Sequence, residues 1–513
     1  MKRILILSHT TGYQLRAFND AAEALGIELV FATDRCHALD DPWQDRAIAV
    51  RFYDVDGSVA AIVEAVQERR VDGLIAVGDR QVLLAARAAA ALGLPWHSTA
   101  GAVASTDKRR SREALAAAGL PSPAFCVFPV TSPHPAPRTR TPPVTSPLPA
   151  PRPPFPLVLK PVGLSGSRGV IRVDDDAGLA AAIERIQALL ARPQIRAARA
   201  GLEDEILVEA YIDGREFAVE GVMSAGELRV FAIFDKPDPL EGPFFEETIY
   251  VTPSREPAAI QARIIDHVAR AAVVLGLRHG PIHAECRVTS AEEVVVLEVA
   301  GRPIGGLCSR VLTFVGAKSA EGANGAGGAG AKGANCAEGA DANETDGAEG
   351  AGAGTGGSAR VSLESVLLEH ALGRALDEWT LAPGAAAVMM IPIPARGLYK
   401  GVAGDDEARA VSGVTDVRIT AKVGQLLEPL PEAGSYLGFI FARGGAPAAA
   451  EASVRAAHAK LRFSIAREVA VRGTGDQGRG GAERGGGERG ARDAERGTRD
   501  AGTENRKPVT GNR

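Results

Sequence analysis

A lysine followed by a glycine-rich turn is the first pattern in the chain that could do chemistry. Lys160 ends a short apolar run, and the glycines after it are spaced three residues apart, with serines between them. The turn carries Gly163, Ser165, Gly166, Ser167 and Gly169. Glycine lets backbone N–H groups approach a polyphosphate, serine adds donors, and lysine adds a positive charge. The pattern indicates a phosphate-binding loop, with an ordinary hairpin carrying a surface lysine as the alternative.

Two glutamates on strands joined by a short turn form the second pattern. The predicted strands are 282–288 and 294–299, and they carry Glu285 and Glu298. If the strands pair, both carboxylates can face one side and share a hard cation such as Mg²⁺. Their apolar neighbours indicate half-buried acids, which need a positive partner nearby. A pair of solvent-facing strand acids is the alternative.

An arginine in a second glycine-rich turn follows these strands. Arg302 lies between Gly301 and the pair Gly305-Gly306. Its planar guanidinium could brace a phosphoryl group or an oxyanion. The turn is therefore a candidate for stabilising charge during a transfer reaction.

A hinge with an acid at each end is the fourth pattern. The strand 206–209 ends at Glu209, and Glu216 begins the next strand after a short turn. Backbone groups in such a hinge can bind the edge of an adenine, and a carboxylate can bind ribose hydroxyls. A plain strand–turn–strand with exposed acids is the alternative.

The elements that position these residues change character along the chain. Up to about residue 118 the apolar periodicity predicts alternating strands and helices, and therefore a parallel sheet with helices on both faces. The predicted strands are 4–7, 27–32 and 73–77, and the predicted helices are 17–25, 58–69, 81–92 and 108–118. From residue 155 an α+β unit with antiparallel pairs follows. Its predicted strands are 157–160, 206–209, 216–221, 228–234, 282–288 and 294–299, with a helix over 262–275.

A third ordered region is predicted over 361–471, with helices at 363–372 and 449–463 and strands near 387–393 and 436–441. Three other segments lack an apolar period and are predicted to be disordered: a Pro-rich insert at 129–154, a Gly/Ala-rich insert at 316–360 and a tail at 472–513.

Composition restricts the class of protein. The chain has 513 residues, enough for about three domains, and a formal net charge of −5, which argues against coating nucleic acid or an anionic membrane. Its five cysteines contain no C-x-x-C pair, which argues against a disulfide framework or a Cys-rich zinc site. Without a secretory pattern or a long apolar run, a soluble cytoplasmic protein is expected.

Taken in chain order, from Lys108 and the turn after Lys160 through the hinge at 209–216 to the paired acids and Arg302, the four patterns resemble the ATP-grasp ligases. The resemblance covers residues 3 to about 470 apart from the two inserts, and it implies three parts: a Rossmann-like domain at 1–105, an ATP-grasp domain at 106–315 and a C-terminal part of the ligase at 361–471. The stretches Leu427-Glu-Pro-Leu-Pro431 and Gly434-Ser-Tyr-Leu-Gly-Phe-Ile440 resemble those of L-amino-acid ligases, relatives of biotin carboxylase.

The resemblance implies roles for the matched residues. The phosphates of ATP would contact the glycine-rich turn, Lys108 and Lys160. The adenine would lie against the hinge residues Glu209, Ala210 and Ile212, and the ribose would bind Glu216. Mg²⁺ or Mn²⁺ would bind Glu285 and Glu298, and Arg302 and Lys160 would act in catalysis. Glu247 would hold a substrate ammonium, with Gly305 and Gly306 beside the substrate. Ala300 departs from the Asn of many members, and Tyr250 departs from a His found in some amino-acid ligases.

The expected function is that of an ATP-dependent carboxylate–amine ligase, which forms an amide through an acyl phosphate and releases ADP and phosphate. One alternative is a carboxylase that activates bicarbonate, and another is a nucleotide-binding protein with weak catalysis. Small-molecule carboxylates and amines, amino acids among them, are the expected partners, without nucleic acid or membrane. A homodimer is compatible with the resemblance.

Overall fold

The computed structural model describes residues 1–9, 14–34, 47–130, 152–198, 201–202, 204–316 and 360–467. These residues belong to one unit, Met1–Glu468, and the second unit, Val469–Arg513, lies outside the described residues. Most of the Pro-rich insert at 129–154, all of the 316–360 insert except its two ends, and the tail at 472–513 also lie outside them. The fold described below is that of the first unit.

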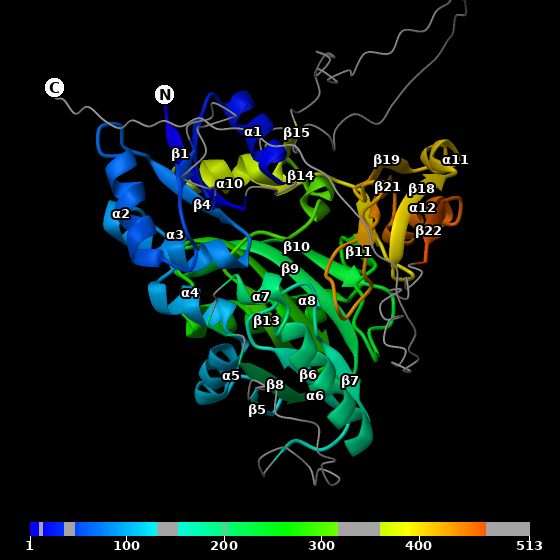
Figure 1. Ribbon diagram of the computed structural model, residues 1–513. Coiled ribbons are helices and arrows are strands. Elements are labelled where there is room, and N and C mark those ends of the chain that lie inside the picture. Colours follow the sequence, from blue (N-terminus) through cyan, green and yellow to red (C-terminus); the bar gives the residue numbers. More distant parts are fainter. Residues whose placement is uncertain are drawn as a thin grey trace, which may run out of the picture. The chain divides into compact units, whose positions relative to one another are not determined.

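A four-stranded parallel sheet begins the chain, as the alternating pattern predicts (Figure 1). Its strands, in the order β3-β2-β1-β4, are β3 Ile48–Ala49, β2 Glu28–Thr33, β1 Arg3–Ser8 and β4 Gly73–Val77. Alternate residues of β1 point to opposite faces of the sheet. Ile4 and Ile6 pack with α1 (Gln14–Leu25), whereas Leu5 and Leu7 pack with α2 (Val55–Ala65) and α3 (Asp79–Leu92).

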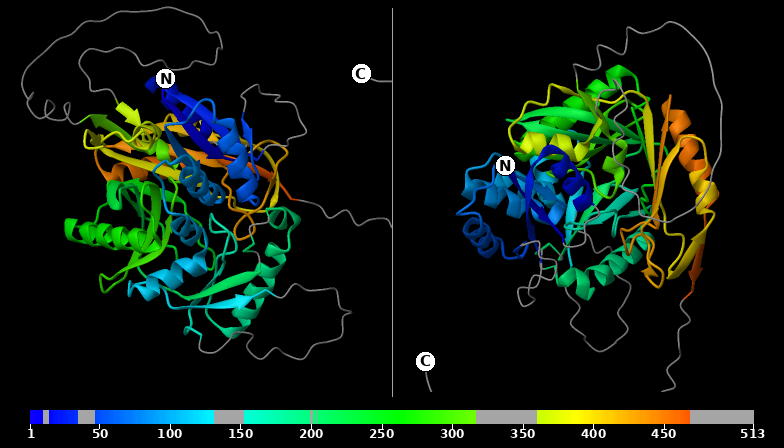
Figure 2. Two further views of the ribbon diagram at one scale, coloured as in Figure 1. Left: turned by 90° about the vertical axis from the view of Figure 1, so that its left-hand side faces the viewer. Right: turned by 90° about the horizontal axis from the view of Figure 1, so that it is seen from above.

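A helix from far along the chain completes one face of this sheet. Helix α10 (Leu363–Ala371) lies beside α1 and against β4 (Figures 1 and 2). The approach is close: a Cβ added at Gly73 would lie 2.3 Å from the carbonyl oxygen of Ala371. The N-terminal sheet and the C-terminal part of the chain therefore share one apolar core.

An antiparallel four-stranded sheet carries the glycine-rich turn. Its strands, in the order β5-β8-β6-β7, are β5 Phe125–Pro129, β8 Glu205–Ala210, β6 Leu157–Pro161 and β7 Ile171–Val173. Helix α6 (Asp176–Leu190) packs its apolar side on this sheet, and Asp175 caps its first turn. The short helix α7 (Pro193–Arg196) follows, and α4 (Thr99–Thr106) and α5 (Lys108–Ala117) connect the sheet to the N-terminal domain.

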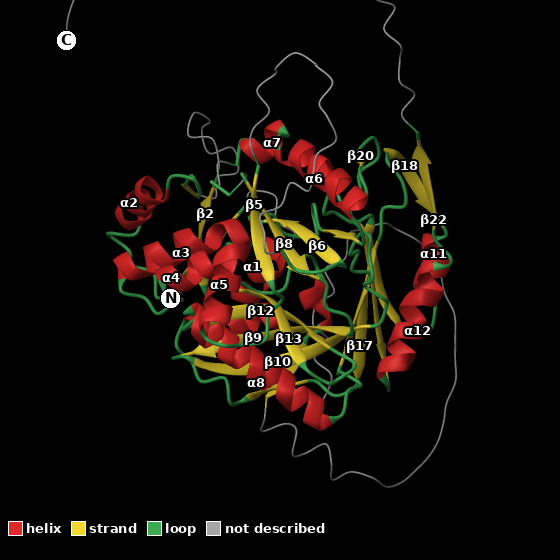
Figure 3. Cartoon of the chain, turned by 90° about the horizontal axis from the view of Figure 1, so that it is seen from below, coloured by secondary structure: helices red, strands yellow, loops and turns green. Residues whose placement is uncertain are grey.

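An eight-stranded antiparallel sheet carries the acidic strands and continues into the C-terminal region. Its strands, in the order β13-β12-β9-β10-β11-β17-β21-β19, are β13 Val294–Ala300, β12 Gly280–Val288, β9 Arg215–Ser224, β10 Glu227–Lys236, β11 Ile249–Thr252, β17 Ala385–Ile391, β21 Gly438–Gly444 and β19 Val414–Ile419. Helix α8 (Ala258–Leu275) packs on β9, β10, β12 and β13, and α12 (Pro447–His458) packs on β17 and β21 (Figure 3).

Shorter elements complete the unit. One small sheet consists of β14 Thr313–Gly316, β15 Arg360–Ser362 and β16 Trp379–Leu381, and another of β18 Gly397–Ala403, β20 Leu426–Leu427 and β22 Arg462–Ala466. A 3₁₀ turn spans Cys308–Val311, and α11 spans Asp405–Arg409. Of the helices in the described ranges, none has both the length and the apolar character that a membrane span requires.

The structure corrects some predicted boundaries. The expected helix 449–463 is wrong at its end, because α12 stops at His458 and Phe463 lies in β22, opposite Val402 of β18. Pairing with β18 gives these residues backbone partners that a longer helix would not offer. Helix α2 begins earlier than predicted, at Val55, because the Asp54 side chain accepts a hydrogen bond from the N–H of Gly57.

Candidate functional site

A cavity of about 490 Å³ lies where the three main sheets meet, and most of the predicted site residues line it. They are Lys108, Lys160, Ser165, Gly166, Ser167, Glu209, Ala210, Ile212, Glu216, Glu247, Glu285, Glu298, Arg302, Gly305 and Gly306. Gly163 and Gly169 do not line it. Gly163 lies beside a much smaller neighbouring cavity, and the N–H of Gly169 donates to the carbonyl oxygen of Pro431, at 2.8 Å.

The hinge glutamate holds the lysine at the start of the glycine-rich turn. Glu209 is 1% exposed, and its carboxylate binds Lys160 Nζ at 2.7 Å and Arg112 Nε at 2.6 Å. Burial would raise the pKa of Glu209, but Arg112 and Lys160 hold it below its usual value. The Glu209 carboxylate therefore positions Lys160, and Ala210, Tyr211 and Ile212 of the hinge line the cavity beside it.

A buried lysine that sequence reasoning missed lies at the centre of three acids. Lys236, at the end of β10, places Nζ 2.8 Å from Glu216 and 3.1 Å from Glu285, and it also binds Glu247. Burial would lower its pKa, but the three carboxylates raise the pKa of Lys236 well above its usual value. Oxygens of these three carboxylates lie within 4.8 Å of one another, and the single Lys236 ammonium offsets only one negative charge of the group. In the sequence, the sign of this residue was a lysine at the end of an apolar strand.

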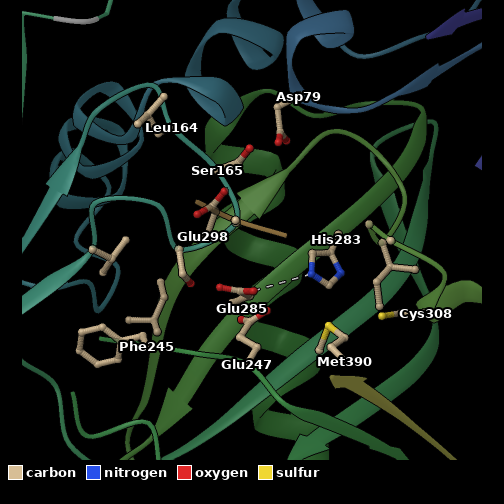
Figure 4. A pocket seen from close by; sticks show the side chains of 18 of the residues that line it. Asp79, Leu164, Ser165, Phe245, Glu247, His283, Glu285, Glu298, Cys308 and Met390 are labelled. Carbon is tan, nitrogen blue, oxygen red and sulfur yellow. Dashed lines mark ion pairs between the residues drawn. The ribbon is translucent and has the colours of Figure 1, made fainter. Parts of the chain in front are cut away.

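The two predicted metal ligands lie opposite each other. Glu285 of β12 and Glu298 of β13 are partners in the strand register, and both line the cavity. Figure 4 shows their side chains in the same pocket, between Ser165 and Glu247. Glu298 lies 3.5 Å from Lys108 Nζ. Burial would raise the pKa of Glu285, but Lys236 and His283 hold it well below its usual value, so it is a charged oxygen donor of the kind Mg²⁺ prefers.

A histidine two residues before the first acid has its own buried partner. His283 Nδ1 lies 3.1 Å from Glu220, and its Nε2 lies 3.8 Å from Glu285 (Figure 4). Glu220 also accepts the N–H of Ile304, at 3.0 Å. Burial would lower the pKa of His283, but the hydrogen bond to Glu220 and the nearby Glu285 carboxylate raise it to about 9. The pair links the acidic strands to the turn that carries Arg302.

The arginine of that turn is held by the N-terminal domain. Arg302 Nε donates to Asp79, the first residue of α3, at 2.7 Å. Burial would raise the pKa of Asp79, but Arg302, Lys108 and a hydrogen bond from Ser165 keep it low. Sequence reasoning missed Asp79, although an acid directly after the strand 73–77 was visible. One carboxylate therefore binds both the arginine and the glycine-rich turn.

Aromatic and apolar side chains line the two ends of the cavity. Beside the hinge, the rings of Tyr211 and Phe245 stack with centroids 6.4 Å apart. At the other end the lining is Tyr250, Cys308, Met390, Tyr436 and Phe439. The Tyr250 hydroxyl donates to Glu247 at 2.8 Å. Burial raises the pKa of Glu247 to about 7.

Comparison with solved structures finds the same fold in several ligases. An L-amino acid ligase from Bacillus licheniformis is 23% identical, covers 91% of this chain and 99% of its own, and gives a TM-score of 0.67. A phosphoribosylglycinamide synthetase from Anaerococcus prevotii is 13% identical over 91% and 100% of the two chains, with a TM-score of 0.55. The biotin carboxylase domain of a Hydrogenobacter thermophilus 2-oxoglutarate carboxylase, in complex with MgADP and bicarbonate, is 14% identical over 90% and 91%, with a TM-score of 0.54.

Family models match three stretches of the chain. An ATP-grasp N-terminal domain matches residues 19–96, an ATP-grasp domain matches 153–311, and the L-amino acid ligase C-terminal domain 2 matches 389–466. No curated protein sequence matches the chain. The predicted resemblance and fold class are therefore confirmed, and the chain belongs to the ATP-grasp superfamily of ligases.

Proposed function

We propose that this protein joins a carboxylate to an amine, with ATP converted to ADP and phosphate, and that amino acids are its substrates. The observation that supports this most is the continuity of the cavity. One cavity is lined by Lys160 and the glycine-rich turn, by Glu285, Glu298 and Arg302, and by Glu247. Residues that can bind phosphate and a candidate site for a substrate ammonium thus line the same cavity.

Two transfers complete the reaction. A carboxylate oxygen of the first substrate attacks the γ-phosphorus of ATP, the bond from that phosphorus to the bridging oxygen of ADP breaks, and an acyl phosphate forms. The amine nitrogen of the second substrate then attacks the acyl carbon, the carbon–oxygen bond to phosphate breaks, and the amide forms. Lys108, Lys160 and Arg302 neutralise the phosphoryl oxygens, which is the main requirement of such transfers.

Glu247 is the candidate partner of the amine. Burial raises the pKa of Glu247 to about 7, so near neutral pH it can accept the proton that the amine must lose before attack. Glu285 and Glu298 would hold Mg²⁺, which would supply positive charge at the phosphates.

The test is a screen for ADP release with Mg²⁺, ATP and pairs of amino acids, with bicarbonate as a separate arm. We expect ADP and an amide in equal amounts, and release only when the substrates are present. Lys160→Gln should abolish release, whereas Lys400→Gln, at an exposed lysine, should not. Formation of AMP and pyrophosphate would contradict the mechanism, and release driven by bicarbonate alone would favour the carboxylase.

A further inference from the structure

A segment of the C-terminal region lies across the glycine-rich turn. We call residues 428–436 the clasp. The carbonyl oxygen of Pro431 accepts the N–H of Gly169 at 2.8 Å. Gly434 packs directly on the turn, since a Cβ added there would lie 2.7 Å from the carbonyl oxygen of Gly166. These contacts join backbone to backbone, at the middle and at the C-terminal end of the turn.

Two ion pairs tie the clasp to the helix behind the turn. Arg185 of α6 donates to both carboxylate oxygens of Glu432, at 2.5 and 2.9 Å. Arg192, just after α6, donates to Glu428 at 2.8 Å. Because α6 packs on the sheet that carries the turn, the clasp bridges the turn and its support.

The turn needs such support because of its backbone conformation. Ser167 has a φ of 55°, in the left-handed region that costs energy for any residue with a Cβ, and its neighbours Gly166 and Gly169 have φ of 66° and 72°. A strained turn holds one conformation only when its surroundings fix it. In the described part of the chain, the clasp supplies a backbone hydrogen bond and a close backbone contact to it.

The clasp also reaches the substrate end of the cavity. Gly434, Ser435 and Tyr436 line the same cavity as Ser165 and Ser167 of the turn. A ligand that rests on Tyr436 therefore touches the same segment that fixes the turn.

We propose that the clasp is a positioning segment, which holds the glycine-rich turn in its phosphate-binding conformation and makes nucleotide affinity depend on the C-terminal region. The proposal rests on the proposed function only in taking ATP and ADP as the ligands of the turn. It assigns Pro431, Glu432 and Gly434 a part in nucleotide binding, although none of them belongs to the ATP-grasp domain match at 153–311.

A single methyl group tests the backbone contact. Gly434→Ala would press against Gly166, whereas Gly445→Ala, the matched control, would meet nothing within 4 Å. With the full chain, we expect calorimetric titration with MgADP to give about tenfold weaker binding for Gly434→Ala and unchanged binding for Gly445→Ala. Gly445→Ala should keep the wild-type melting temperature without nucleotide, whereas Gly434→Ala should lower it slightly and remain folded, because the Gly166 carbonyl must shift. In turnover, KM for ATP should rise more than kcat falls.

A charge exchange tests the ion pair. Arg185→Glu and Glu432→Arg should each weaken MgADP binding by about two- to fivefold, and the double variant should recover most of the loss. Wild-type affinity in Gly434→Ala, or a double variant no better than the singles, would overturn the proposal. Wild-type protein that binds no MgADP would overturn the proposed function as well, so the two failures are distinguishable.

Discussion

At the scale of single residues, the pair between Asp79 and Arg302 sets the direction of the arginine. We expect Asp79→Asn to lower kcat for ADP release about tenfold or more while KM for ATP changes less than about twofold, because Arg302 loses the partner that aims it at the cavity. More ADP than amide should form if the acyl phosphate is left less protected. Steady-state kinetics with both products measured would show this.

The control for this variant is another aspartate of the same domain. Asp56 lies 2.6 Å from Arg87, but its side chain is 82% exposed, so Asp56→Asn should leave kcat unchanged. Equal ADP and amide at the wild-type rate in Asp79→Asn would show that the ion pair serves only to hold the domains.

The facing acids on β12 and β13 give a second prediction at this scale. Glu285→Gln and Glu298→Gln keep the size of the side chain but remove a charged oxygen donor, so each should lower kcat by about 10²-fold and raise the Mg²⁺ concentration needed for half-maximal rate. Glu292→Gln, in the exposed turn between the same strands, is the control. If either variant at the paired positions retained the wild-type rate and Mg²⁺ requirement, that acid would be structural.

Residue types and spacing were enough to predict most of the residues that line the cavity. The paired acids could be predicted because a short turn forces neighbouring strands into register. Lys236, Glu220 and Asp79 could not be predicted, because each lies in a mostly apolar element and only tertiary contacts show which group its side chain faces. The Glu209 carboxylate binds Lys160 and Arg112, and the sequence alone does not specify that choice of partners.

At the scale of elements, three histidines join α10, β12 and the segment before α4. The rings of His279 and His370 stack 4.2 Å apart, Ser224 Oγ lies 3.1 Å from His370 Nε2, and His97 Nε2 lies 3.0 Å from the carbonyl oxygen of Pro281. Burial lowers the pKa of His97 to about 4 and that of His370 to about 3. These rings therefore stay neutral in the folded protein at pH values where free histidine is charged.

This cluster predicts a loss of stability in mild acid. Below pH about 6.5, His97 and His370 become protonated in the unfolded chain but stay neutral in the folded protein. The free energy of unfolding therefore falls as the pH drops from about 6.5 towards 4, by about 1.4 kcal/mol per pH unit for each histidine. His370→Asn should therefore show a smaller decrease between pH 7 and 5 in urea unfolding than the wild type. His267→Asn, on α8 with Nδ1 near the Arg263 carbonyl, should follow the wild type. Identical pH slopes for all three proteins would contradict the assignment.

Sequence periodicity located most elements but not their ends. The strand 73–77 coincides with β4, since its residues are buried on both faces and glycine and aspartate bound it. Helix α6 was not predicted, and the closing helix was predicted too long, because a capping side chain or a strand partner decides such boundaries. Strands β17, β19 and β21 extend the sheet that carries the acidic strands. This pairing joins distant parts of the chain, so local sequence patterns do not reveal it.

At the scale of the whole molecule, the connection between β14 and β15 should tolerate shortening. These strands pair, with Val315 opposite Arg360, so the two ends of the 317–359 connection are already neighbours. We expect replacement of residues 317–359 by a short Gly/Ser linker to raise the free energy of unfolding by about 1–2 kcal/mol at most, from the lower cost of closing a shorter loop, and to leave ADP release unchanged.

Thermal unfolding and steady-state kinetics of the shortened protein check this, with the full chain as reference. A severalfold rise in KM or fall in kcat at an unchanged melting temperature would show instead that the connection acts at the site, which it follows closely in sequence.

The close packing of Gly73 against Ala371 has a consequence for synthesis on the ribosome. The face of the first sheet that carries Ile4, Ile6 and Ile75 is covered partly by α10, which emerges only after the whole ATP-grasp domain has been translated. At a translation rate of about 5–20 residues per second, this apolar face of the nascent N-terminal domain therefore stays partly uncovered for tens of seconds. We expect that face to be a client site for ribosome-associated chaperones, and fragments that end before α10 to precipitate when expressed alone.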